Sequence, residues 1–423
     1  MARNPSAAPT APIVRPFRAL RAGASRAAEV IAPPYDVLTS EEARARARGK
    51  PMSFLHVSKP EIDFSPGTDP HRPEVYAKAQ ANLKAMEAAG AMVRDRAPGY
   101  YVYRLTKNGH MQTGLAAAGS IDAFRANVIR RHELTRPDKV EDRARQIEAV
   151  AAHTGPVFSV HRPSGPLAAA IRATVEAPPA VAAVADDGGR HELWAISDPA
   201  AVRDISDSFR DLGVIYVADG HHRSDAATLV ADRRRAANPN HRGDEPYNFF
   251  LVVSFPANEV RILDYNRVVR DLAGLGPTQI CAKLGEVFDI EPRSERVRPS
   301  RRGEFGLYFD RRWFRLVLRD QPAAGGDPIE RLDVTLLSRR ALEPILGIGD
   351  PRKDTRIDFV GGGRGLEELE RLVDSGEMAA AFALFPTTID DLFAVADAGR
   401  NMPPKSTWFE PKLVDGLVAL PLD

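Results

Sequence analysis

The sequence has almost no cysteine, no long apolar run and almost no net charge, and each absence excludes a class of protein. Cys281 is the single cysteine, so the chain has no internal disulfide framework and no cysteine-rich zinc module, as in a reducing cytoplasm. No apolar run approaches the ~18–20 residues of a membrane span. The chain has 58 Lys and Arg residues and 57 Asp and Glu residues, so it has no large excess of positive charge that would favour nucleic acid as a partner. We therefore expect a cytoplasmic protein without membrane contact.

The length of 423 residues exceeds that of one typical core and predicts two or three compact units. Residues 1–16 are rich in Ala and Pro and lack an apolar segment with a cleavage site, which predicts a disordered tail and no signal peptide. We expect three further parts: an N-terminal α/β region at 17–95, a core at 96–270, and a C-terminal α+β lobe at 271–423.

One stretch organises the rest of the chain. Residues 213–218 form a short, β-branched apolar run that predicts a buried strand, and Asp219 and Gly220 break it. Apolar residues then recur with helical spacing up to Ala237. A strand, a glycine turn and a helix in this order aim backbone N–H groups and the helix dipole at one point, where anions bind.

Four of the five residues of this turn are suited to binding an anion, and Asp219 is the exception because a carboxylate repels phosphate. Gly220 permits close approach of a ligand, Arg223 offers a planar fork for phosphate or carboxylate, and His221 and His222 offer donors. Asp219 is a helix cap, a Mg²⁺ ligand or an acceptor for a substrate hydroxyl. The alternative is that Asp219 caps the helix, Arg223 pairs with a neighbour and one histidine is a core residue. We favour a ligand site, because five polar residues at the end of a strand exceed what capping needs.

A second polar stretch, residues 129–143, combines a candidate base with cations. Its candidates are His132, Glu133, Thr135, Lys139 and Arg143, the types that phosphoryl transfer needs for positioning and charge neutralisation. The alternative is a solvated charged face. The stretch is not a zinc motif, because it lacks the second histidine of His-Glu-x-x-His.

Two proline-rich segments present further polar residues. Pro33 and Pro34 precede Tyr35 and Asp36, which could hold a substrate, although Asp36 could instead cap the helix at 40–50. Residues 402–407 offer Lys405 to an anion, or form a turn anchored by aromatic residues.

Elsewhere the patterns give local expectations. Lys107-Asn108-Gly109 predicts a hairpin, and residues 53–57 a strand. Residues 247–255 predict a core strand with which 261–263 could pair. The glycine-rich stretch 361–365 has no Walker lysine, so a flexible linker is the favoured interpretation.

Four motifs together resemble one family. Asp219-Gly220-His221-His222-Arg223 resembles the phosphate-binding box of the ParB and sulfiredoxin-like superfamily, whose members include free serine kinases that use ADP or ATP. With that box, three other motifs resemble the domain of unknown function (DUF) family 1015: 32–37, 132–143 and 402–407. The resemblance implies an α+β fold: a mixed-sheet, ParB/sulfiredoxin-like nucleotide-binding core with additional N-terminal and C-terminal α/β elements.

The function expected is that of a small-molecule kinase using ATP or ADP with Mg²⁺, and free L-serine is the acceptor that the resemblance implies. The expected phosphate ligands are the turn 220–223 with Lys139, Arg143 and Lys405. The candidate catalytic groups are Glu133, Asp219 and His221, with Asp219 also a metal ligand, and the substrate would contact Tyr35, Asp36, His132 and Thr135. The alternatives are a ParB-like nucleotide-binding regulator and a metal-dependent phosphohydrolase using His221 and His222. The oligomeric state is open.

Overall fold

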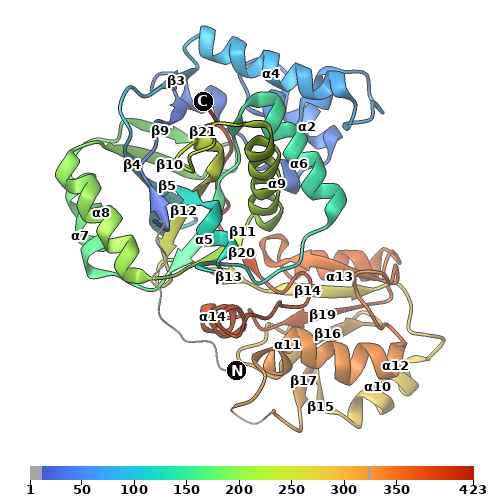
Figure 1. Cartoon of the computed structure of the whole chain (residues 1–423). Coiled ribbons are helices and arrows are strands. Elements are labelled where there is room, and N and C mark those ends of the chain that lie inside the picture. The colour runs from blue at the N-terminus through green and yellow to red at the C-terminus, as the bar shows by residue number, and fades with distance from the viewer. Residues whose placement is uncertain (1–11, 323–324) are drawn as a thin grey trace. The chain divides into compact units, whose positions relative to one another are not determined.

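The computed structural model describes residues 12–322 and 325–423, which form two compact units (Figure 1). The first unit contains the chain up to Arg131, Thr135–Val260 and Pro411–Asp423. The second contains His132–Leu134 and Arg261–Glu410. The expected boundary at 270/271 therefore lies ten residues late, and the C-terminal residues belong to the first unit.

The first unit is built on a nine-stranded mixed sheet with the order β6-β11-β8-β12-β5-β4-β10-β9, and β1 pairs with β5. β11 is parallel to β6, and β12 is parallel to β8, while the other pairs are antiparallel. The strands are β1 (Val14–Arg15), β4 (Tyr100–Lys107), β5 (His110–Ser120), β6 (Ile129–Arg130), β8 (Val157–His161), β9 (Val181–Val184), β10 (Arg190–Ile196), β11 (Ile215–Asp219) and β12 (Phe249–Pro256).

The expected hairpin joins β4 to β5. Asn108 and Gly109 lie between the strands with φ of 49° and 73°, the left-handed conformations that a tight two-residue turn requires. β12 is the expected core strand, and all but its last residue are buried.

The first unit also contains helices. They are α1 (Ala27–Val30), α2 (Ser40–Ala47), α3 (Leu55–Ser58), α4 (Pro73–Ala88), α5 (Ile121–Arg125), α6 (Pro137–Val150), α7 (Gly165–Val175), α8 (Pro199–Leu212) and α9 (His221–Ala237). Of these, α5, α7, α8 and α9 contribute to the apolar core of the large sheet. Ala227 and Ala231 of α9 pack in the sheet's core cluster, whereas Ala226 and Val230 pack with Ile147 of α6. α9 therefore has two buried faces, and α6 runs beside it (Figure 1).

A smaller sheet brings distant parts of the first unit together. Its order is β3 (Met92–Arg94), β2 (Leu20–Ala22), β21 (Val418–Pro421) and β7 (Ala152–His153). Just before β21, Ala32 and Asp415 form an antiparallel bridge through both of their backbone hydrogen bonds. The C-terminal segment is therefore fixed beside the Pro33–Asp36 motif.

The second unit is built on a six-stranded antiparallel sheet with the order β15-β17-β16-β19-β14-β18. Its strands are β14 (Tyr265–Val269), β15 (Phe288–Arg293), β16 (Glu304–Phe309), β17 (Arg312–Leu318), β18 (Ile357–Gly361) and β19 (Ala380–Leu384). A separate pair joins β13 (Ile262–Leu263) to β20 (Trp408–Phe409). The helices are α10 (Pro277–Gly285), α11 (Asp333–Leu337), α12 (Glu343–Leu346), α13 (Glu367–Asp374) and α14 (Ile389–Asp397).

Several local expectations are wrong. Residues 53–57 lie mostly in helix α3, because a short buried apolar run fits a helix as well as a strand. Residues 261–263 contribute β13, which pairs with β20 and not with β12. Of the expected disordered tail, residues 1–11 lie outside the described residues, whereas Val14 and Arg15 form β1.

The glycine-rich stretch is not a linker. Gly361 ends β18, and residues 362–364 form a 3₁₀ turn. A Cβ on Gly361 would lie 2.4 Å from Trp408 Cε3, and one on Gly362 would lie 2.6 Å from Asp264 Oδ1. The glycines are therefore needed for close packing.

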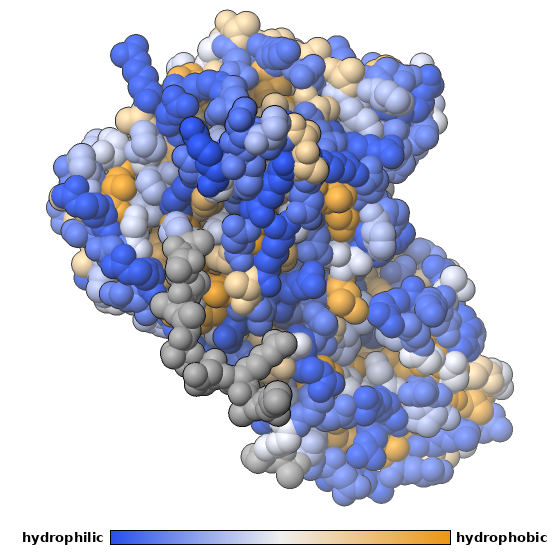
Figure 2. All heavy atoms as spheres, viewed as in Figure 1, coloured by the Kyte–Doolittle hydropathy of each residue, from blue (hydrophilic) through white to orange (hydrophobic). Residues whose placement is uncertain are grey.

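Among the described residues, no helix is both long enough and apolar enough to cross a membrane. In Figure 2 the hydrophobic residues on the visible face are scattered among hydrophilic ones.

Candidate functional site

The expected strand–turn–helix unit is present in the first unit of the structure. β11 ends at Asp219 and α9 begins at His221, with Gly220 between them at φ 95°. The pairing register of β11 with β8 shifts between Val217 and Asp219, which is typical of a β-bulge and redirects the side chain at the strand's end. Gly220 is the N-cap, and no side chain caps the helix. The simplest interpretation of Asp219, a helix cap, is therefore wrong.

Asp219 instead pairs with a lysine from the C-terminal segment. Lys412 Nζ lies 2.6 Å from Asp219 Oδ2, and Gly220 N–H donates to Asp219 Oδ1 at 2.9 Å. Burial alone would raise the pKa of Asp219, but Lys412 and Arg223 lower it well below its usual range. Asp219 also outweighs the effect of burial on Lys412 and raises the pKa of that ammonium. Both groups are therefore charged at neutral pH.

Arg223, on the first turn of α9, points back towards β8 and the Pro33–Asp36 motif. Its Nη1 donates to Pro156 O at 2.7 Å, and its Nη2 donates to Asp36 Oδ2 at 3.1 Å. The arginine side chain is 11% exposed, whereas that of Asp36 is 40% exposed. Burial lowers the pKa of Arg223, but Asp36 and Asp219 raise it by more. An anion that reached this guanidinium would compete with an exposed carboxylate.

Tyr35 lies against two arginines. The Cζ of Arg143 lies 4.1 Å from the ring centroid of Tyr35, and that of Arg223 lies 5.6 Å from it. Burial, and then Asp36, raise the pKa of Tyr35 to about 12, so the phenol keeps its proton. Arg143 Nη2 donates to Asp142 at 2.7 Å, and the Tyr76 hydroxyl donates to the same carboxylate at 2.7 Å. Arg143 of α6 is therefore held by the ring of Tyr35 and by the carboxylate of Asp142.

A second residue of the C-terminal segment, Asp415, is buried in this group. Burial raises the pKa of Asp415 to about 7, against the lowering effect of Arg223. A Cβ on Gly155 would lie 3.2 Å from Asp415 Oδ1 and 3.3 Å from Arg223 Nε. A methyl group at position 155 would therefore require Asp415 and Arg223 to shift by a few tenths of an ångström.

The site therefore combines three cations with four carboxyl groups, all within the first unit. The cations are Arg143, Arg223 and Lys412, and the carboxyl groups are Asp36, Asp142, Asp219 and Asp415. At neutral pH Asp415 is partly protonated, so the charges nearly balance without a ligand. Binding a phosphate would require the cations to exchange some of these carboxylates for phosphate oxygens.

Arg131 and Thr135, which precede and follow residues 132–134, both contact α9 within the first unit. Arg131 Nη1 and Thr135 Oγ1 both donate to Asp225 of α9, at 3.0 Å and 2.6 Å. Thr135 is thus engaged with a carboxylate of the protein. His132 is buried and groups with the second unit together with Glu133, and its carbonyl accepts from Met402 N–H.

The other sequence candidates lie in different settings. His221 is buried at the start of α9, and His222 Nε2 accepts from the backbone N–H of Arg136 at 3.1 Å. Lys139 is exposed on the first turn of α6, and in the part of the chain that the structure describes no hydrogen bond joins its side chain to the 219–223 turn. Lys405 belongs to the second unit.

Sequence reasoning missed Lys412, Asp415 and Gly155. Lys412 and Asp415 each lie beside apolar residues in the sequence, which was a weak signal that this segment is buried. The structure buries residues 413–422. Ionisable groups within a buried segment need partners.

The surroundings of Asp219 do not fit a magnesium ion. Both of its oxygens accept hydrogen bonds from the protein, and one partner is the Lys412 ammonium, which a divalent cation would have to displace. No group of three or more His, Cys, Asp or Glu residues suited to a metal ion occurs among residues 12–322 and 325–423. The expected metal role of Asp219 has no support in this geometry.

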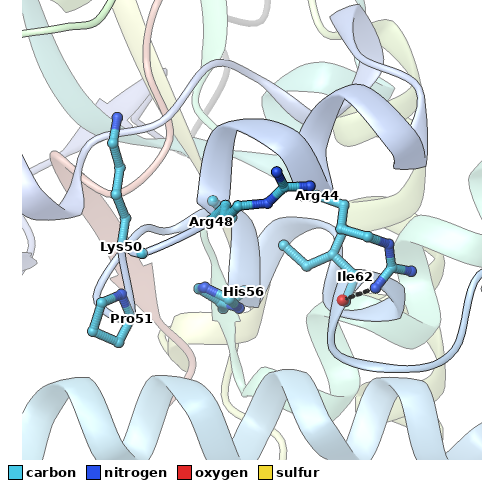
Figure 3. Close-up of a pocket in the computed structure, with 8 residues that line it drawn as sticks. Arg44, Arg48, Lys50, Pro51, His56 and Ile62 are labelled. Atoms are coloured by element: carbon cyan, nitrogen blue, oxygen red, sulfur yellow. Dashed lines mark hydrogen bonds between the residues drawn. The ribbon is translucent and has the colours of Figure 1, made fainter.

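A pocket in the first unit lies apart from these residues. It has a volume of about 380 Å³ and is lined by Arg44, Arg48, Lys50, His56 and neighbouring residues (Figure 3). Arg44 donates to the carbonyls of Ile62 and Phe64, and Lys50 pairs with Asp186. We place the site at the turn and not in this pocket, because the pocket is at the C-terminal end of α2, where the helix dipole disfavours anions.

Comparison with known families gives one clear result. The chain belongs to the family described as "Protein of unknown function (DUF1015)", which it matches over residues 14–335. The family membership inferred from the motifs is thereby confirmed; three of the four motifs lie within the matched residues, and 402–407 lies outside them. No curated protein matches the chain.

Several solved structures show a weak likeness. One is a free serine kinase in complex with AMP, with a TM-score of 0.34 and 13% identity over 70% of this chain and 86% of that chain. Another is SbnI with C-terminal truncation from Staphylococcus aureus, with a TM-score of 0.36 and 12% identity over 71% and 85%. A conserved hypothetical protein from Pyrococcus furiosus has a TM-score of 0.33 and 12% identity over 71% and 93%. No conclusion about this chain follows from likenesses of this size.

Proposed function

We propose that this chain is a nucleotide-dependent phosphotransferase with a ParB-like core, which transfers a phosphoryl group from ATP or ADP to the hydroxyl of a small molecule. The first acceptor to test is free L-serine, with O-phosphoserine as the product. The observation that carries the proposal is the turn at 219–223. It places Arg223 and the N-terminus of a long helix beside Lys412, and both cations are fixed by carboxylates.

Phosphate binding would use groups that the protein already holds in position. Asp36 is the most exposed partner of Arg223, so the donor's phosphate would replace it on the guanidinium fork. Arg143 and Lys412 would add positive charge, and Gly220 lets the phosphate approach the backbone. In phosphoryl transfer most of the catalysis is positioning and charge neutralisation, which these groups would supply.

The proton of the acceptor hydroxyl needs a carboxylate with an accessible lone pair. Asp219 suits this role poorly, because its two oxygens are engaged and its pKa is strongly lowered. We therefore propose Glu133 as the base on chemical grounds, because it is a carboxylate within the 132–143 motif. In the proposed step the hydroxyl oxygen bonds to the terminal phosphorus, the bond to the nucleotide's bridging oxygen breaks, and the proton passes to Glu133.

Substrate contacts follow from the same arrangement. Asp36, once displaced from Arg223, could bind the ammonium of an amino acid. Tyr35 offers a neutral hydroxyl beside it. We retain His132 and Thr135 as neighbours of the acceptor and His221 and His222 as groups that shape the phosphate end of the site.

The test is mass spectrometry of the protein incubated with Mg²⁺, L-serine and either ATP or ADP. We expect O-phosphoserine from the wild type, a loss of at least ~100-fold in Arg223→Ala or Glu133→Gln, and near-normal turnover in Arg210→Ala, which removes an exposed arginine of α8. Near-normal turnover in Arg223→Ala and Glu133→Gln would contradict the mechanism. Nucleotide binding without any phosphorylated product, together with nucleotide-dependent association with DNA or another protein, would instead favour a regulator.

A further inference from the structure

Arg267 is a buried arginine without an acidic partner. It lies on β14 of the second unit and is 3% exposed. In the part of the chain that the structure describes, no carboxylate lies within ion-pair distance of it, and its hydrogen bonds all go to backbone carbonyls. These acceptors are Tyr265 O at 2.6 Å, Lys405 O at 3.0 Å and Pro404 O at 3.3 Å. A buried charge that lacks a counter-charge is costly to the fold.

The unused donors of Arg267 lie on one edge of the guanidinium. The three bonds engage Nη1 twice and Nη2 once, out of five N–H groups. Nε–H and the second Nη2–H remain, and no acceptor for them is found among residues 12–322 and 325–423. Two parallel N–H groups on one edge form the fork that binds two oxygens of a carboxylate or a phosphate.

A second cation lies on the loop that Arg267 holds. Lys405 is exposed, and its Nζ lies 5.8 Å from the ring centroid of Tyr265, while Arg267 Cζ lies 6.0 Å from the same centroid. No carboxylate within the described ranges pairs with Lys405. The two cations therefore lie near the same aromatic ring, and among the described residues neither has a carboxylate partner.

The backbone of this loop is held in an unusual conformation. Lys405 has a φ of 57°, a left-handed conformation that costs energy in a residue with a side chain. Arg267 donates to the carbonyls of Pro404 and Lys405. Ser406 Oγ donates to Pro403 O at 2.6 Å, and Thr387 Oγ1 donates to Ser406 O at 2.7 Å. A strained backbone that several side chains maintain is typical of ligand sites.

The nearby acid does not neutralise these cations. Asp264 accepts from Asn266 Nδ2 at 2.5 Å and from Arg298 Nη1 at 3.5 Å. Burial lowers the pKa of Arg267 to about 10, which leaves it charged at neutral pH. Two positive charges match a phosphate group, which carries nearly two negative charges, better than they match a carboxylate.

We propose that the second unit binds a phosphate group at the free edge of Arg267 and the ammonium of Lys405. This oxyanion site is built only from residues of the second unit and does not depend on the phosphotransferase activity proposed for the first. The competing explanation is that Arg267 only clamps the 402–407 loop and binds no ligand.

Hydrogen-exchange mass spectrometry of the full chain separates these explanations. Inorganic phosphate is the probe, with acetate at matched ionic strength as the carboxylate control and with Arg223→Ala as the background that weakens the first unit's site. We expect phosphate to slow exchange in peptides covering 402–409 by at least ~5-fold, and acetate to have little effect. Lys405→Gln should weaken this protection several-fold, and Arg267→Lys, which keeps the charge without the fork, should abolish it.

The control is Lys353→Gln, which removes an exposed lysine elsewhere in the second unit and should leave the protection unchanged. Lys405 is exposed, so Lys405→Gln will fold even if Arg267→Lys does not. Absence of protection by phosphate would overturn the proposal, as would equal protection by acetate or protection that Lys405→Gln does not reduce.

Discussion

The ammonium of Lys412 lies 2.6 Å from Asp219 Oδ2, although 193 positions separate the two residues in the sequence. The pair joins the C-terminal segment to the turn between β11 and α9. Because the side chains are 21% and 31% exposed, respectively, the pair is largely shielded from water. Its contribution to the free energy of unfolding should exceed that of an exposed ion pair.

Replacement of Lys412 by methionine should therefore destabilise the first unit by about 1–3 kcal/mol, because it leaves the Asp219 charge without its main partner. The same change should weaken nucleotide binding. Lys50→Met is the matched control, since Lys50 and Asp186 form a pair of similar length with side chains 45% and 56% exposed. Urea unfolding of both variants measures the difference, and equal stability of the two would show that the Lys412 pair has no special role.

Gly155→Ala tests the close packing around Asp415 and Arg223. The added methyl would contact both charged side chains, so we expect at least ~10-fold weaker nucleotide binding from their displacement. Gly165→Ala adds the same methyl at a position where no atom lies within 4 Å, and should bind nucleotide normally. Calorimetric titration with ATP and ADP gives the comparison. Unchanged affinity in Gly155→Ala would mean that these two side chains do not form part of the site.

The buried carboxyl of Asp415 predicts a pH dependence of stability. Its pKa of about 7 in the folded protein lies above the ordinary value of 3.8, so the folded state binds this proton more tightly than the unfolded chain. The resulting stabilisation is complete below about pH 4 and is lost as the pH rises towards 7. Asp415→Asn mimics the protonated form, so its stability advantage over the wild type should be roughly 2–3 kcal/mol larger at pH 8 than at pH 5.

Denaturant titrations at pH 5 and pH 8 test this expectation, with the exposed Asp320→Asn as a control that should show no such difference. If the advantage of Asp415→Asn is no larger at pH 8 than at pH 5, the carboxyl is ionised at neutral pH and its charge is compensated by the surrounding arginines.

Local chemistry allowed much of this structure to be predicted. β-Branched residues before Asp219 and helical spacing after Gly220 were enough for the central strand, turn and helix, and Asn108-Gly109 for the hairpin. The same information was ambiguous at residues 53–57, where a short apolar run forms a helix. A local sequence pattern predicts a helix or strand where a turn motif bounds it or a hydrophobic period runs through it.

The partners at the site could not be predicted in the same way. Lys412 and Asp415 reach it only because β21 pairs with β2 and β7 and because Asp415 bridges to Ala32. These pairings join the two ends of the chain, and no local signal specifies them. The glycine-rich stretch 361–365 was misjudged for a related reason, since its packing against Trp408 involves residues distant in sequence.

The most direct test of a phosphate site at the β11–α9 turn is calorimetric titration of ATP and ADP into three proteins: the wild type, Arg223→Ala and Arg131→Ala. Arg131 is the matched control. It pairs with Asp225 of α9, the helix that carries Arg223, but its own side chain is 49% exposed. We expect the wild type and Arg131→Ala to bind with equal affinity, and Arg223→Ala to bind at least ~30-fold more weakly, since a charged hydrogen bond is lost. A wild type that binds neither nucleotide, or an Arg223→Ala variant that binds as tightly as the wild type, would contradict the account.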